Sequence, residues 1–266
     1  MRRSPVVADQ FYPGDPRILR ATLAELIPAD SKPKTEALAV IAPHAGYIYS
    51  GGVAGQTFAA VNIPEDVIIL GPNHHGHGAP IALMHEGEWE MPLGRVPINQ
   101  HLAALLTDPV IERDDLAHRF EHSLEVQVPF LQALQKNLAI VPLVISHVPF
   151  SLCQAVGKAI AGAIKKYGKP VLLVASTDMT HYESRQSAGR KDRLALDHIT
   201  NLDPQGLYNT VIGKGISMCG IMPTTIVLIA ALELGATRAQ LIRYTDSGEA
   251  SGDTDHVVGY AGLVIS

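Results

Sequence analysis

The stretch VIILGPNHHGH at residues 67–77 decides the fold class of this chain. Its apolar run Val67–Leu70 is typical of a strand buried on both faces of a sheet, and Gly71-Pro72 ends the run. Similar runs recur at 37–42 (ALAVIA), 138–145 (LAIVPLVI) and 171–175 (VLLVA). Because helical stretches alternate with these strands, we predict an α/β fold with a mostly parallel or mixed central sheet and helices on both faces.

The segments between the runs carry apolar residues at helical spacing. Asp15 and Pro16 provide a cap and a first turn for an amphipathic helix that ends before Pro28. Further helices are predicted at 123–136, 191–199 and 224–234, and two late strands at 240–244 and 257–265. No repeat, low-complexity segment or linker interrupts this pattern, so we expect residues 1–266 to form a single domain.

The composition excludes several classes of function. The 266 residues include 21 Lys and Arg against 26 Asp and Glu, which gives a formal net charge of −5. Nucleic acid is not an expected partner, because a phosphate-binding surface needs a clustered surplus of Lys and Arg. The N-terminal stretch lacks the apolar run of a signal peptide, and no segment approaches the roughly 18 apolar residues of a membrane helix. We therefore expect a cytoplasmic protein that is not bound to a membrane.

Three of the 12 histidines lie in the loops that follow predicted strands. His44 comes after the run at 37–42, His74 after the run at 67–70 and His181 after the run at 171–175. Ligands of open α/β sheets bind beyond the carboxyl ends of the strands, where such loops converge. Since neutral imidazole is a ligand for zinc, copper, iron and nickel, the three histidines predict a metal site. Taken singly, each could instead cap a strand.

Several neighbouring residues are candidates for roles around such a site. Asp178 lies three residues before His181, so it could bind the metal or orient an imidazole. Adjacent residues of an extended chain point to different sides, so one of His74 and His75 faces the crevice and the other does not. We choose His74 as the ligand because it is the first after the turn. His122 could act as a general acid or base in the same crevice, with Glu121 beside it. Alternatively, residues 121–125 simply cap the helix predicted to begin there.

The two cysteines are too few for a disulfide framework. We interpret Cys153 as a packing residue inside a helical stretch. Cys219 lies in a loop just before the helix predicted at 224–234. A thiol near a helix N-terminus has a depressed pKa, which would make Cys219 a nucleophile or a soft metal ligand.

Five ordered motifs give the chain a specific resemblance to the Memo family, also called AmmeMemoRadiSam system protein B in prokaryotes. The motifs are APHAGY at 42–47, GPNHH at 71–75, EHSLE at 121–125, Asp178 with His181, and Cys219-Gly220. The resemblance runs nearly end to end and implies a domain similar to the class III extradiol, non-haem iron dioxygenases. It also implies a crevice lined by His44, His74, His181 and Cys219.

The resemblance further implies a metal and partners. Animal Memo proteins are associated with iron or copper and with redox activity, so iron or copper is the expected metal, with zinc as a further possibility. Prokaryotic relatives are named together with a radical S-adenosylmethionine protein and an AMMECR-type protein, which are therefore the expected partners. The substrate, a small molecule or a peptide, is not implied, and neither is the oligomeric state.

Three hypotheses follow for the function. The first is a metal-dependent redox enzyme, in which His44, His74 and His181 bind the metal, Asp178 orients a ligand, Cys219 joins or tunes the site and His122 moves protons. The second is a non-catalytic module that captures a peptide or small molecule in the same crevice. The third is a zinc hydrolase with Asp178 or Glu121 as general base.

Overall fold

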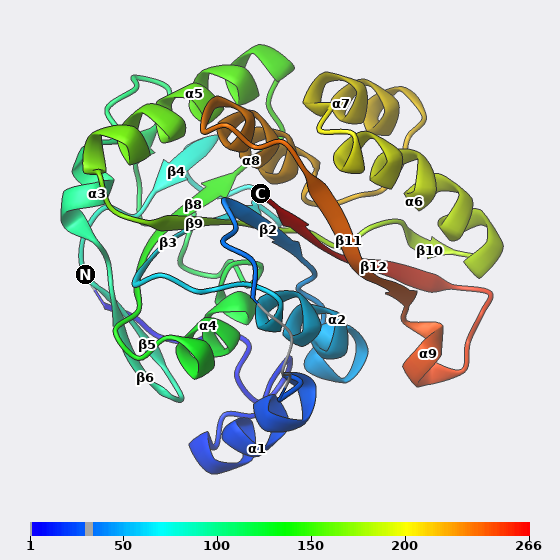
Figure 1. The fold of residues 1–266 in the computed structure, drawn as a ribbon. Helices are drawn as coiled ribbons and strands as arrows, with labels where there is room; N and C mark the ends of the chain where they lie inside the picture. The colour runs from blue at the N-terminus through cyan, green and yellow to red at the C-terminus, as the bar shows by residue number, and fades with distance from the viewer. Residues whose placement is uncertain (1, 30–33) are drawn as a thin grey trace.

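The structure is a computed structural model that describes residues 2–29 and 34–266 (Figure 1). Its helices are α1 (Pro16–Leu26), α2 (Tyr47–Ala59), α3 (Gln100–Ala104), the 3₁₀ helix η1 (Glu125–Gln127), α4 (Val128–Leu134), α5 (Phe150–Tyr167), α6 (Arg185–Thr200), α7 (Pro204–Gly213), α8 (Ile221–Glu233) and α9 (Gly248–Ser251). Its strands are β1 (Arg2–Arg3), β2 (Ala39–Ala42), β3 (Asp66–Pro72), β4 (Ile81–Leu83), β5 (Glu88–Met91), β6 (Gly94–Pro97), β7 (Glu112–Arg113), β8 (Ala139–Ile145), β9 (Val171–Ser176), β10 (His181–Glu183), β11 (Ala239–Asp246) and β12 (Val257–Ile265).

The central sheet is mixed and runs in the order β10-β12-β2-β9-β3-β8-β4-β7, with β11 paired to β12. Its middle strands β2, β9, β3 and β8 are mutually parallel, as the four apolar runs predict. Ala42 of β2 pairs with Ser176 of β9, and Leu70 of β3 pairs with Ala175. The carboxyl ends of these three strands are therefore level, and the loops that follow them start from one edge of the sheet.

Helices cover both faces of the sheet and bury two separate hydrophobic cores (Figure 1). On β3, Ile68 and Leu70 face the core under α5, α8, α6 and α7, while Val67 and Ile69 face the core under α1, α2 and α4. This alternation is what a strand buried on both faces requires. The predicted fold class, an α/β domain with a mixed sheet and helices on both faces, is confirmed.

The helix predicted at 123–136 is shorter than expected. Residues 121–124 instead cross the carboxyl ends of β3 and β9, and α4 begins only at Val128. Ser123 explains the difference, because its hydroxyl donates to the Pro72 carbonyl at 3.1 Å and its own carbonyl accepts from the Ser176 hydroxyl at 2.6 Å. These bonds hold the segment in a non-helical path beside the strand ends.

Two further features complete the architecture. A small sheet of order β1-β5-β6, which the apolar runs did not predict, packs Trp89 and Val96 into the core under α1, α2 and α4. Within the described ranges, none of the helices is both long and apolar enough to cross a membrane.

Candidate metal centre

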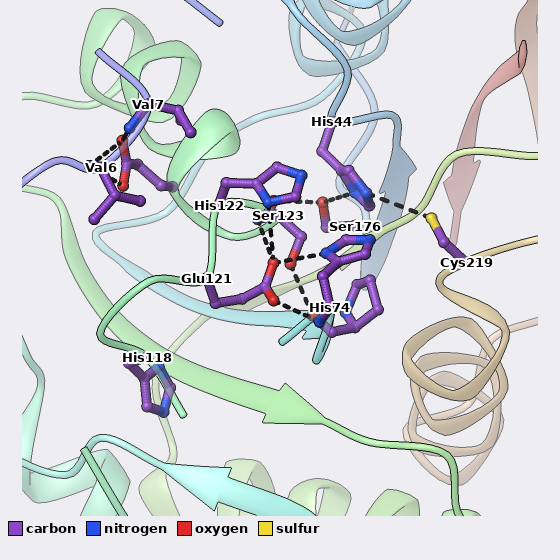
Figure 2. Close-up of polar contacts among 12 residues, drawn as sticks. Val6, Val7, His44, His74, His118, Glu121, His122, Ser123, Ser176 and Cys219 are labelled. Carbon is purple, nitrogen blue, oxygen red and sulfur yellow. Dashed lines mark hydrogen bonds and ion pairs between the residues drawn. The ribbon is translucent and has the colours of Figure 1, made fainter. Parts of the chain in front are cut away.

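Three histidine rings meet at the carboxyl edge of the sheet (Figure 2). His44 follows β2, His74 follows β3, and His122 comes from the segment that crosses the strand ends. One ring nitrogen from each lies within 4.8 Å of the others, which makes the three a group that could hold a metal ion. The ring centroids of His74 and His122 are 4.6 Å apart, and that of His44 lies 5.3 and 5.6 Å from them.

The Nδ1 atom of each ring has a polar partner within 3.5 Å. His44 Nδ1 lies 2.9 Å from the Ser176 hydroxyl. That hydroxyl donates its single proton to the Ser123 carbonyl, so it must accept from His44 Nδ1–H, and the lone pair of His44 is on Nε2. His74 Nδ1 and His122 Nδ1 lie 2.8 and 3.5 Å from Glu121 Oε1. A carboxylate or hydroxyl behind each imidazole is the usual arrangement around a bound metal.

Glu121 supplies a buried negative charge behind two of the rings. Its side chain is 1% exposed, and it also accepts the backbone N–H groups of His74 at 2.7 Å and Ser123 at 2.9 Å. Burial by itself would raise the pKa of Glu121, but the hydrogen bond and charge of His74 and the Ser123 N–H outweigh it and hold the pKa well below its usual range. The carboxylate is therefore ionised, and its charge favours a cation among the rings.

Two of the imidazoles have a lowered pKa. Burial, together with the charge that His74 and His122 carry when protonated, lowers the pKa of His44 well below its usual value. Burial also lowers the pKa of His122 to about 4. Neutral imidazole is the form that ligates metal, so these rings need not lose a proton at neutral pH to bind one.

Cys219 lies at the rim of the three rings, with Sγ 3.4 Å from His44 Nε2. Gly220 makes this approach possible, because a Cβ at that position would collide with the Ser176 carbonyl and the Thr177 side chain. The low pKa that the sequence predicted for the Cys219 thiol is wrong. Burial and the charge of Asp178 raise the pKa of the Cys219 thiol far above its usual value, although the sulfur accepts the Asp178 N–H at 3.2 Å.

Asp178 and His181 make contacts other than the ones that the sequence predicted for them. The Asp178 carboxylate accepts the backbone N–H of His44 at 2.8 Å, so it positions the ligand loop through its backbone and not through an imidazole. His181 Nδ1 contacts the Ser217 carbonyl at 2.9 Å. Among the described residues, His122 and not His181 completes the close group with His44 and His74.

His75 lies outside the group of three, as expected, and two residues beside the group were not predicted. His75 and His77 are exposed, with ring centroids 5.8 Å apart, and do not belong to the group of three. The two residues that were not predicted are Ser176, whose hydroxyl contacts His44 Nδ1, and Gln127, whose Nε2 donates to the Ser176 hydroxyl at 2.8 Å. Together they orient the His44 ring. Ser176 follows the 171–175 run directly, and this position was the one available signal. Cys153 is fully buried beside Met222, in agreement with its packing role.

The donor set fits a metal ion. Three imidazoles whose Nδ1 atoms have polar partners, an adjacent sulfur and an ionised carboxylate behind them suit zinc, copper or iron. The fold and the site together define an α/β protein with a group of three histidines at the carboxyl ends of its parallel strands.

The chain belongs to the Memo family. The family's sequence model, described as Memo-like protein, matches residues 3–264. A MEMO1 family protein of Methanosarcina barkeri is 38% identical over 264 residues, with 99% of each chain covered. MEMO1 family proteins of Methanopyrus kandleri and Methanothermobacter thermautotrophicus are each 40% identical, over 279 and 276 residues, and cover 99% of this chain and 99 and 100% of their own lengths.

A solved structure supports the fold independently. The crystal structure of the uncharacterized protein JW3007 from Escherichia coli K12 superposes with a TM-score of 0.50 at 16% identity, covering 84% of this chain and 98% of that chain. At this identity the likeness concerns the fold alone.

Proposed function

We propose that this chain is a metal-dependent redox enzyme of dioxygenase-like architecture that binds iron or copper through His44, His74 and His122. The observation that carries the proposal is the convergence of three imidazole rings, one ring nitrogen from each lying within 4.8 Å of the others, while the Nδ1 atom of every ring has a polar partner. Memo family membership is consistent with it.

Each neighbouring residue has a role in this proposal. Iron or copper would supply one-electron redox chemistry and a binding position for oxygen. Glu121 orients His74 and His122 and balances part of the positive charge. Cys219 lies where its sulfur can join or tune the donor set beside His44. Asp178 accepts the backbone N–H of His44 at 2.8 Å and so positions the loop that carries this ring. The proposal includes a cytoplasmic location and, as partners, a radical S-adenosylmethionine protein and an AMMECR-type protein.

A zinc hydrolase is the second candidate, because three histidines also form the protein ligands of catalytic zinc sites. Such an enzyme needs a carboxylate or imidazole free to activate water. Glu121 and Asp178, the two bases considered from the sequence, accept N–H groups that position His74 and His44. Both carboxylates thus already have structural partners, and this favours the redox proposal.

Metal content per chain tests the proposal. The protein is purified without oxygen or chelator, reloaded separately with iron, copper and zinc, and analysed by mass spectrometry. We expect near-stoichiometric iron or copper in the wild type, loss in His44→Ala and His74→Ala, and full retention in His101→Ala, an exposed histidine of α3. Retention of metal by both site variants would refute the metal centre.

The redox step is tested on the same samples. Oxygen uptake with ascorbate as electron donor should rise when iron or copper is loaded and should fall to the metal-free level in His74→Ala. Zinc-loaded protein is the matched control, because zinc is redox-inactive. Uptake that is equal in metal-free and metal-loaded protein would contradict the redox assignment, and ester hydrolysis only by the zinc form would support the second candidate.

A further inference from the structure

The N-terminal segment 3–12 is fastened to the helix η1 by a buried ion pair. Arg3 Nη1 lies 2.8 Å from Glu125 Oε2, and the two side chains are 3% and 0% exposed. The same carboxylate accepts the N–H groups of Val6 and Val7 at 2.9 to 3.1 Å and the Tyr12 hydroxyl at 2.6 Å. One carboxylate thus ties several points of the segment to the body of the protein.

The guanidinium of Arg3 also donates hydrogen bonds to the segment that leads into Glu121 and His122. Its Nε donates to the His118 carbonyl at 2.7 Å, and its Nη2 donates to the Glu121 carbonyl at 2.6 Å. The guanidinium stacks 4.2 Å from the Trp89 ring centroid, which fixes its plane. Arg3 therefore places the main chain of Glu121, the residue whose carboxylate orients His74 and His122.

The N-terminal segment touches the metal site from a second side. The Phe11 ring meets the His122 ring edge-on, with centroids 5.0 Å apart. Phe11 is held in turn, because its carbonyl accepts the Tyr47 N–H at 2.7 Å and the Tyr47 hydroxyl donates to the Val126 carbonyl at 2.8 Å. The segment consequently limits how far the His122 ring can turn.

We propose that Arg3 and Glu125 are positioning residues of the metal centre, which act by placing Glu121 and His122. The inference rests on the proposed function. A carboxylate that orients imidazoles does so only within a narrow range of distance and angle, so a small shift of the Glu121 main chain weakens both contacts. Stability alone is a weak reason for a buried ion pair, because apolar replacements are often equally stable.

The variant Arg3→Lys separates positioning from stability. A lysine ammonium can still pair with Glu125, but it cannot also reach the His118 and Glu121 carbonyls as the planar guanidinium does. Zinc(II) is the probe, because it is redox-silent and takes imidazole ligands. We expect zinc affinity, measured against a chromophoric chelator below the melting temperature, to fall by about 10-fold or more, the usual effect of losing an outer contact of a metal ligand.

The matched control is Asp66→Asn, at the opposite end of β3 from the metal site. Asp66 is also buried and accepts the Tyr167 hydroxyl at 2.8 Å, so its loss should reduce stability and leave zinc affinity unchanged. If Arg3→Lys does not fold, Glu125→Gln replaces it, because glutamine removes the charge partner of Arg3 and keeps an acceptor for Tyr12. The same loss of affinity is expected.

A measurement on metal-free protein distinguishes failure of the positioning role of Arg3 from failure of the proposed function. Nitrogen-15 NMR of the imidazoles should show His74 protonated at Nδ1 in the wild type and a mixture of tautomers in Arg3→Lys. Wild-type zinc affinity together with an unchanged tautomer in the variant would overturn the positioning role. If the wild type itself binds no metal, the proposed function fails, and the tautomer alone decides the role of Arg3.

Discussion

Glu121 contacts His74 twice, through Oε1 to the ring Nδ1 at 2.8 Å and through Oε2 to the backbone N–H at 2.7 Å. One buried carboxylate therefore fixes both the main chain and the ring of a single candidate ligand. The Glu121–His74 contacts join the segment 121–124, which crosses the strand ends, to the loop after β3. The same contacts therefore fix the backbone at this edge of the sheet and the position of the His74 ring.

Replacing Glu121 by Gln should weaken metal binding without unfolding the protein. Glutamine keeps the shape but removes the charge and presents an N–H₂ group toward the donors of His74. We expect metal affinity to fall by roughly 10- to 100-fold. Chelator competition measures the change, and Glu183→Gln, which loses only a half-exposed ion pair with Lys191, is the control. Equal affinities in the two variants would contradict the orienting role.

Gly71 should not tolerate a side chain. A Cβ there would lie 2.5 Å from both Leu124 Cδ1 and Ser123 Oγ, so the crossing segment would have to move away from β3. We expect Gly71→Ala to cost about 1–3 kcal/mol of unfolding free energy and to lower metal affinity. Gly162→Ala in α5 has open space around the new methyl group and should instead gain about 0.5–1 kcal/mol. Urea unfolding of both variants checks the opposite signs.

Cys219 should be a poor nucleophile in the metal-free protein. Because burial and the Asp178 charge raise the pKa of its thiol, almost none of it is thiolate at neutral pH. Alkylation by iodoacetamide, followed by mass spectrometry, should be slower than that of glutathione at pH 7.5. Alkylation faster than that of glutathione would restore the low pKa that the sequence suggested.

His118 should make the metal-free protein less stable in mild acid. Burial lowers the pKa of His118 to about 4 in the fold, while the unfolded chain takes up the proton near the ordinary value. Neutral His118 therefore contributes fully to the free energy of unfolding above about pH 6.5. This contribution, at most about 3 kcal/mol, is lost as the pH falls toward 4. The variant His118→Gln keeps a donor for the Ala82 carbonyl and removes the titration. Urea unfolding at pH 7, 5.5 and 4.5 should show a flatter pH dependence in the variant, and parallel curves would contradict this assignment.

The apolar runs were sufficient to predict the central strands and the edge at which the site lies. A strand buried on both faces leaves a continuous apolar signature, as Val67–Leu70 does, and the polar loop after it must then emerge at the carboxyl end. His44 and His74 follow such runs closely, so their proximity could be predicted from the sequence.

The third imidazole could not be predicted in the same way. His122 reaches the site because Ser123 bonds to the ends of β3 and β9, and tertiary hydrogen bonds of this kind leave no periodic signal. The pKa of Cys219 depends likewise on burial and on Asp178, which is 41 positions away in the chain. Helix proximity favoured a low pKa, and desolvation was the larger effect.

The central claim, that His44, His74 and His122 hold a metal, is tested most directly by X-ray absorption spectroscopy of the iron(II)- or copper(I)-loaded protein. The account predicts three imidazole ligands in the wild type, two in His122→Ala and three in His181→Ala. An imidazole lost in His181→Ala and none lost in His122→Ala would contradict it.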